Sequence, residues 1–215
     1  ETGELRGQGF SGVLGQRVVS GQPLNVWYLA IHEGIDKTTG QSIYTGGDPA
    51  ANKFYLGSPN PKTILGLSTD VAYKKFTAAL NFNGTFGQYL FNNTAATVLG
   101  IGNLGNRNIA KSILGGDAKE AISNAPAPSN RYLEKGNYIK LANATLSYRV
   151  GKIGNVIRNL NISLTGQNLF VITKYTGFDP EVNTDAGSGG IPSLGVDYVP
   201  YPSARTIILG VNFSL

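Results

Sequence analysis

The chain has 215 residues, a formal net charge of +5 and few charged side chains. Asp, Glu, Lys and Arg make up 14% of it, against about 25% in typical soluble domains, whereas Gly, Tyr and Phe are abundant. The chain contains no Cys and one His, which excludes disulfides, thiolate metal sites and any catalytic site that needs two imidazoles. Its Lys and Arg residues are scattered, so we expect no nucleic-acid groove. This composition favours a sheet with one polar and one apolar face.

Membrane helices are excluded as well, because no run of about 18 apolar residues occurs. Membrane-spanning strands are not excluded, since each needs only about 9–11 residues of alternating character. The chain begins with Glu, lacks Met and opens with no signal-peptide pattern. We therefore expect it to be a piece of a longer protein.

The first half of the chain predicts two strand pairs. Residues 23–33 form one expected strand, and the weaker strand 41–45 is expected to pair with its end across the segment 34–40. Residues 63–73 and 75–90 predict a hairpin that turns at Lys74 and Lys75. Apolar and polar residues alternate in its second arm, and period two is the signature of a strand with two different faces. Further along, residues 108–123 predict a short helix.

The next predicted strand, residues 136–150, changes parity in its middle. Ile139 and Leu141 occupy one set of alternate positions, whereas Leu146 and Tyr148 occupy the other. An extra residue in a strand reverses which face the following side chains take. We therefore predict a β-bulge at residues 142–143 that returns all four side chains to one face.

Two further strands, 159–173 and 205–215, complete the pattern. Counted back from the C-terminus, the connections are long (174–204), short (151–158), long (91–135), very short (74–75) and long (34–61). Outer-membrane barrels have short periplasmic turns and long extracellular loops. The alternation therefore predicts an all-β, antiparallel transmembrane β-barrel in a bacterial outer membrane, with a periplasmic C-terminus and extracellular long loops.

Three phrases in the second half resemble a known family. They are RYLEKGNYIKLANATLSY at residues 131–148, LTGQNLFVITKYTGFDPE at 164–181 and VDYVPYPSART at 196–206. Weaker matches are GSPNPK at 57–62 and GQPLNVWY at 21–28. In this order and spacing they resemble the C-terminal part of the SusC/RagA-type TonB-dependent (TonB-linked) outer membrane transporters of Bacteroidota.

The resemblance implies a specific domain organisation. Such transporters form a barrel of about 22 strands, of which this chain would supply about the last six. Residues 1–20 would end the preceding barrel segment or form a turn. Residues 21–215 would be the C-terminal strands and extracellular loops, and the plug domain and the TonB-contacting segment would lie outside this chain.

The same resemblance implies a function and a set of partners. The family takes up nutrients, importing glycans or peptides with energy relayed by TonB, and a SusD-like surface lipoprotein covers the barrel as a lid. The implied partners are therefore this lipoprotein, the remainder of the same barrel and plug, TonB, outer-membrane lipid and the substrate. The assembly would be a dimer of heterodimers. We expect no enzyme activity and no cofactor.

A run of acidic side chains offers one candidate metal site. Asp179, Glu181 and Asp185 lie at alternate positions, as at the start of a calcium loop. The EF-hand pattern then requires Gly and Glu where this chain has Thr184 and Gly190. A solvated loop is therefore the preferred interpretation, and an irregular cation site is the alternative.

Aromatic and polar side chains supply the other candidates. Tyr132, Tyr198 and Tyr201 lie in the long loops, where they could stack on a sugar or contact the lid. Aromatic residues near strand ends, Trp27 and Tyr175 among them, are expected in an interfacial girdle. A set of uncharged polar residues is expected to face the lumen and the plug: Asn81, Asn83, Thr85, Asn161, Ser163, Thr165, Gln167 and Asn212.

Two alternatives remain open. One is an outer-membrane barrel subunit for protein export or surface assembly, which would share the fold but not the nutrient transport. The other is a soluble β-sandwich carbohydrate-binding module. It would behave as a monomer in water without detergent, whereas a sheet with an apolar outer face would not.

Overall fold

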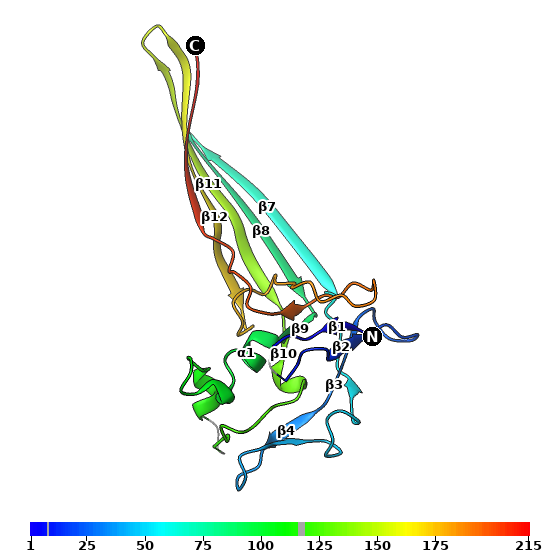
Figure 1. Cartoon of the computed structure of the whole chain (residues 1–215). Coiled ribbons are helices and arrows are strands. Elements are labelled where there is room, and N and C mark those ends of the chain that lie inside the picture. The colour runs from blue at the N-terminus through cyan, green and yellow to red at the C-terminus, as the bar shows by residue number, and fades with distance from the viewer. Residues whose placement is uncertain (8, 116–118) are drawn as a thin grey trace. The chain divides into compact units, whose positions relative to one another are not determined.

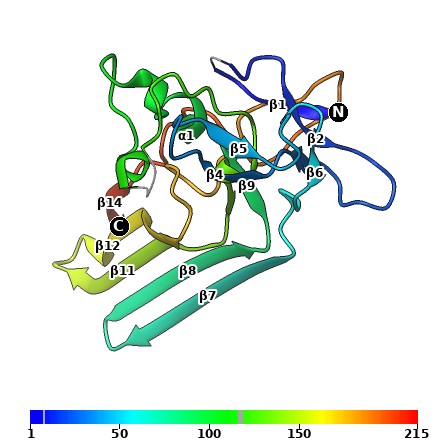
Figure 2. The ribbon, with the colours of Figure 1, turned by 90° about the horizontal axis from the view of Figure 1, so that it is seen from below.

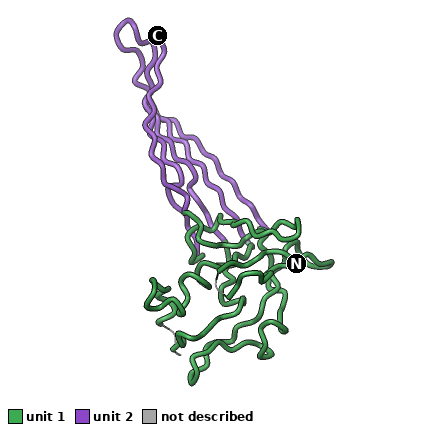
Figure 3. The backbone as a smooth tube through the Cα atoms, in the orientation of Figure 1, with its two compact units in different colours: residues 1–61, 87–136, 175–201 green, residues 62–86, 137–174, 202–215 purple. Residues whose placement is uncertain are grey.

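The computed structural model describes residues 1–7, 9–115 and 119–215, and most of its regular structure is β (Figure 1). The chain folds into two compact units that alternate along the sequence (Figure 3). Unit 1 comprises Glu1–Pro61, Gly87–Gly136 and Tyr175–Tyr201, and unit 2 comprises Lys62–Phe86, Asn137–Lys174 and Pro202–Leu215. No helix among the described residues is long and apolar enough to cross a membrane.

Unit 2 is a single antiparallel sheet of five strands (Figure 2). The strand order is β14-β12-β11-β8-β7. The strands are β7 (Thr63–Tyr73), β8 (Phe76–Phe86), β11 (Tyr138–Ile153), β12 (Ile157–Thr173) and β14 (Thr206–Ser214). The predicted strands of this region are confirmed, as is the hairpin at Lys74 and Lys75. β8 ends four residues earlier than predicted, because Gly87 takes a φ of 90° and the chain then leaves the sheet.

The predicted bulge in β11 is also confirmed. Leu141 pairs with Phe82 and Asn143 with Asn81, so Ala142 is the extra residue opposite β8. On the other side, Leu141 pairs with Phe170 and Asn143 with Gln167, so β12 carries an extra residue of its own. Asn168, in that gap, has a φ of 52°, a conformation that Asn tolerates better than most residues. The bulge therefore brings the apolar residues before and after it to one face.

Unit 1 is built from short strands and single helical turns. One sheet has the order β1-β2-β3-β6, a second has the order β10-β9-β13, and β4 pairs with β5. The bounds are β1 (Thr2–Glu4), β2 (Leu14–Arg17), β3 (Val26–Leu29), β4 (His32–Ile35), β5 (Ser42–Tyr44), β6 (Phe54–Tyr55), β9 (Tyr89–Asn92), β10 (Leu133–Lys135), β13 (Val196–Asp197), α1 (Asn93–Thr97), η1 (Ile101–Asn103), η2 (Lys111–Gly115) and η3 (Asn130–Tyr132).

An aromatic core holds unit 1 together. Phe91 lies between Trp27, Tyr132 and Phe10, with ring centroids 5.9, 6.3 and 6.3 Å away. Trp27 is fully buried, and its indole N–H donates to the carbonyl of Tyr89 at 2.9 Å. Burial of such large side chains is the dominant stabilising term in a small domain. Segments predicted as long loops thus form a folded unit with a core of its own.

Three sequence-based predictions are wrong. The strand 23–33 is split into β3 and β4, because Ala30 between them bonds to the 128–130 segment instead of continuing the ladder. Of the helix 108–123, the described residues form only the turn η2, and the amide of Ala121 donates to the carbonyl of Gly40 instead of to a residue of the same segment. Residues 116–118 of that prediction lie outside the described part of the chain. Trp27 and Tyr175 are buried in unit 1, so neither belongs to an exposed girdle.

The pairing of 41–45 with the end of the first segment is confirmed as β4–β5.

Candidate functional site

The two faces of the unit 2 sheet differ in chemistry. Side chains of directly paired residues in an antiparallel sheet share a face. The register therefore places these residues together on an apolar face: Leu65, Leu67, Val71, Tyr73, Phe76, Ala78, Leu80, Phe82, Ile139, Leu141, Ala144, Leu146, Tyr148, Ile162, Leu164, Phe170, Ile172, Ile207, Leu209, Val211 and Phe213. Leu209 and Phe213 are 70% and 61% exposed, whereas Leu141, in the middle of the sheet, is buried. An apolar surface of this extent requires an apolar cover.

The opposite face carries mainly hydroxyl and amide side chains. All eight side chains predicted to face the lumen lie on it, and the register extends the set by Asn143, Thr145 and Ser147. The hydroxyls of Thr145 and Thr165 are hydrogen-bonded at 2.9 Å across β11 and β12. Near the β7–β8 turn this face lines a hollow of about 550 Å³. Lys74, Lys75 and Arg149 also line this hollow. Such a surface holds water and offers hydrogen bonds, which suits the wall of an aqueous passage.

The sheet has two open edges within unit 2. β7 and β14 are its outermost strands, and each pairs with one neighbour in the sheet. An edge strand presents a row of unpaired backbone N–H and C=O groups, which favours pairing with a further strand. In hydrocarbon such an edge would cost several kcal/mol for each unsatisfied group. The described sheet is therefore suited to be a section of a larger one.

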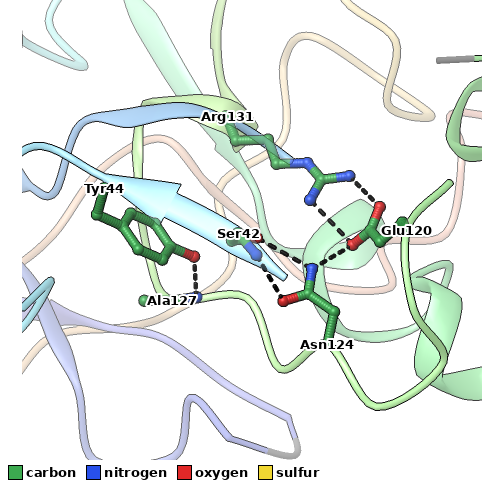
Figure 4. Close-up of polar contacts among 6 residues, drawn as sticks. All are labelled: Ser42, Tyr44, Glu120, Asn124, Ala127 and Arg131. Atoms are coloured by element: carbon green, nitrogen blue, oxygen red, sulfur yellow. Dashed lines mark hydrogen bonds and ion pairs between the residues drawn. The ribbon is translucent and has the colours of Figure 1, made fainter. Parts of the chain in front are cut away.

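A cluster of polar side chains joins β5 to the 120–131 segment of unit 1 (Figure 4). Arg131 forms a two-pronged ion pair with Glu120, with N···O distances of 3.0 and 2.5 Å. The side-chain amide of Asn124 donates to Glu120 at 2.6 Å and to the Ser42 hydroxyl at 3.0 Å. The Tyr44 hydroxyl accepts a bond from the Ala127 amide at 2.7 Å. This cluster holds the 120–131 segment against β5.

His32 lies beside that cluster, and its ring meets the Tyr44 ring edge-on at 5.7 Å. Burial lowers the pKa of His32 below its ordinary value of 6.5. The positive charge of Arg131 lowers it further, and Glu120 acts in the opposite direction. His32 is therefore neutral at pH 7 in the folded protein.

A second buried cluster surrounds Asp197. Its carboxylate accepts hydrogen bonds from the Tyr175 hydroxyl at 2.5 Å and the Thr94 hydroxyl at 2.6 Å. Burial raises the pKa of Asp197, although both hydrogen bonds oppose that shift. Burial and the Asp197 carboxylate raise the pKa of Tyr175. The cluster joins β13, α1 and the segment after β12, and its groups are buried from solvent, so we assign it a structural role.

The residues singled out in the sequence take different positions. Tyr132 packs in the core of unit 1 and is 7% exposed, which favours packing over ligand contact. Tyr198 is half-buried, whereas Tyr201 is 93% exposed. The carboxylates of Asp179 and Asp185 accept bonds from the nearby backbone amides of Glu181 and Gly187. Among the described residues, no three His, Cys, Asp or Glu side chains gather as metal ligands would.

The sequence interpretation missed both polar clusters. Glu120, Arg131 and Asp197 are charged residues in a chain with few charges, and two of them lie within the phrases that resemble a family. A charged residue within one of these phrases was the sequence signal that could have indicated the clusters. Their partners, among them Ser42 and Thr94, are distant in sequence, so no local pattern could reveal them.

Comparisons with known proteins give concordant results, although no family model matches the chain. The chain is 28% identical over 176 residues to TonB-dependent receptor P3 and 30% identical over 175 residues to TonB-dependent receptor P26, both of Formosa agariphila. These matches cover 75% and 73% of the chain. It is also 24% identical over 185 residues to the TonB-dependent receptor SusC of Bacteroides thetaiotaomicron, covering 83% of the chain. The chain belongs with the SusC/RagA-type TonB-dependent receptors.

Solved structures of this family share the fold. The RagAB peptide transporter matches with a TM-score of 0.74 at 22% identity, covering 93% of this chain and 24% of the matched chain. The RagAB peptide importer in its open-open state matches with a TM-score of 0.72 at 24% identity, covering 95% of this chain and 24% of the matched chain. The present chain spans 17% of the length of its curated TonB-dependent relatives. Its strands are thus of the kind found in the antiparallel barrel of this family.

Proposed function

We propose that the chain forms the C-terminal barrel portion of a SusC-like TonB-dependent transporter that imports glycans or peptides across the outer membrane. The observation that carries this proposal is the two-faced sheet of unit 2. Its apolar face would contact lipid, and its hydroxyl and amide face would contact the aqueous lumen and the plug. β7 and β8 have 11 residues each, which corresponds to about 36 Å of strand, enough to cross a bilayer core of about 30 Å.

The connections support the proposed orientation. The sheet is antiparallel, so the segments 87–136 and 175–201 both leave from one end of it. The two-residue turn after β7 and the turn after β11 lie at the opposite end. Short turns are periplasmic in outer-membrane barrels, and long connections are extracellular. We therefore place unit 1 outside the cell and the C-terminus in the periplasm.

Unit 1 would then meet the substrate and the lid. Its aromatic core and partly buried ion pair give the loops a defined shape, which is a requirement for recognition. Tyr201 is the exposed aromatic side chain that could stack on a sugar or contact a SusD-like lipoprotein, and Tyr198 offers part of its ring. The matched RagAB protein is a peptide importer, whereas the substrate of this chain is open between peptides and glycans.

Cysteine labelling tests the arrangement, since this chain has no Cys. Asn106→Cys in the 87–136 segment and Asn155→Cys in the β11–β12 turn are a matched pair of exposed asparagines. In the full-length receptor, freed of any other cysteine, a membrane-impermeant maleimide should label Asn106→Cys in intact cells. It should label Asn155→Cys only after the outer membrane is permeabilised. Labelling of both positions in intact cells would contradict the assignment.

Transport is tested in the same strain. Deletion of the parent gene should abolish uptake of fluorescent oligosaccharide or peptide pools that the wild type takes up, and complementation should restore it. Unchanged uptake of every pool, together with normal membrane insertion, would favour the alternative of a barrel for export or surface assembly.

A further inference from the structure

The charges of unit 2 are strongly one-sided. The sheet and its flanking residues contain nine Lys or Arg residues and a single acid, Asp70. These cations lie toward the ends of the strands, and the central stretches are almost uncharged. Five of them belong to the end with the short turns: Lys74, Lys75, Arg149, Lys152 and Arg158. No Asp or Glu occurs in residues 71–78, 146–164 or 210–215, the segments that form this end.

Aromatic rings accompany these cations on the apolar face. Tyr73 and Phe76 form the last pair of the β7–β8 hairpin, and Tyr148 pairs with Phe76 on the next strand. The Lys74 ammonium lies 5.2 Å from the Tyr73 ring centroid, and that of Lys75 lies 6.0 Å from the Tyr148 ring centroid. Tyr73 is 67% exposed. Aromatic rings with a cation just beyond them suit the boundary between hydrocarbon and headgroups.

We propose that this basic–aromatic edge, formed by Lys74, Lys75, Lys152, Arg158 and the three rings named above, binds the phosphodiester headgroups of anionic phospholipids. Arg149 is not part of it, because it pairs with Asn161 on the polar face and lines the hollow there. The inference rests on the proposed function, which places this end of the sheet at the periplasmic leaflet. The rings lie at the hydrocarbon boundary, and the ammonium and guanidinium groups extend to the phosphates. Four cations with no Asp or Glu in the segments of this end complement an anionic surface, and each such cation strengthens attraction to anionic lipid.

The test compares lipid retention by the full-length receptor in nanodiscs of phosphatidylcholine with one fifth phosphatidylglycerol. The variant Lys74→Gln, Lys152→Gln, Arg158→Gln removes three exposed cations. It leaves Lys75 intact, whose ammonium donates to the Val150 carbonyl and so supports the hairpin. Native mass spectrometry should show enrichment of phosphatidylglycerol on the wild type and a loss of roughly tenfold in the variant.

The matched control removes three exposed cations of unit 1, in Lys37→Gln, Arg107→Gln, Lys111→Gln. This control has the same net charge as the Lys74→Gln, Lys152→Gln, Arg158→Gln variant, but it should retain as much phosphatidylglycerol as the wild type. Equal losses in both variants, or equal retention of the two lipids by the wild type, would overturn the proposal. A receptor that fails to insert into any bilayer would instead contradict the membrane-spanning role of the sheet, so the two failures are distinguishable.

Discussion

The two units of this chain differ in the exposure of their apolar side chains and in their net charge, although both contain the same kinds of residue. Unit 1 buries its large apolar side chains and contains nine Lys or Arg and twelve Asp or Glu residues, a net charge of −3. Unit 2 exposes its apolar side chains along whole strands and has nine Lys or Arg and one Asp, a net charge of +8. Trp27 is fully buried in the first, whereas Leu209 is 70% exposed in the second. Unit 1 has the character of a domain in water and unit 2 that of a sheet in lipid.

The difference shows where each unit gets its stability. Unit 1 depends on its aromatic core and on side-chain clusters that join distant segments. Unit 2 depends on a backbone hydrogen-bond ladder across its five strands, which in hydrocarbon is worth more than in water, because no solvent competes for the N–H and C=O groups. Substitutions of one chemical type should therefore have different consequences in the two units.

The largest effect is expected for Trp27→Ala. This change leaves a cavity among Phe91, Leu29 and Leu5 and removes the bond to the Tyr89 carbonyl. We expect unit 1 to lose about 3–5 kcal/mol of stability. Hydrogen exchange of unit 1 amides in the full-length receptor measures this loss of stability. Leu209→Ala, the matched truncation on the apolar face of the sheet, should cost about 1 kcal/mol or less, and an equal cost would remove the distinction between the units.

The next prediction concerns unit 2, where a cation is inserted on each face of the sheet in turn. Leu164→Arg places a cation in the middle of the apolar face, whereas Ser163→Arg places it on the polar face one residue away. In a membrane barrel the first should cost about 2–4 kcal/mol and the second much less. Reversible urea unfolding in lipid vesicles measures the difference. Equal tolerance of both variants would argue against lipid on the apolar face and for a water-soluble sheet.

The smallest effect is a pH dependence confined to unit 1. The pKa of His32 is lowered in the folded state, so the unfolded chain binds the proton more tightly. The contribution of His32 to stability is present above pH 6.5 and is lost as the pH falls below 6.5 toward the lowered value. Protection factors of amides in residues 32–44 should fall between about pH 7.5 and 5, and those of β12 should not. A His32→Gln variant should lack this dependence, and its persistence there would assign it to another group.

The long strands were predictable because they are encoded locally. A period of two over nine or more residues needs no tertiary contact, and the parity change at Leu141 and Leu146 was enough to locate the bulge. The resemblance phrases at 131–148, 164–181 and 196–206 indicated the family for the same reason, since each is continuous in sequence. The split between β3 and β4 was not predictable, because Ala30 bonds to residues about 100 positions away.

By itself, the sequence determined the two-faced strands, their hairpin and their bulge, because side-chain alternation is a local property of extended backbone. It also indicated the family, because each of the resemblance phrases is continuous in sequence. Only the tertiary structure decided that the long connections fold into a unit with its own core. Trp27, Phe91 and Val196 come from three separate stretches of chain, and their mutual burial exists only once those stretches are brought together. The bonds of Asp197 to Tyr175 and Thr94 and the partly buried ion pair of Arg131 with Glu120 were decided at the same level, since each depends on how separate segments of the chain fold against one another.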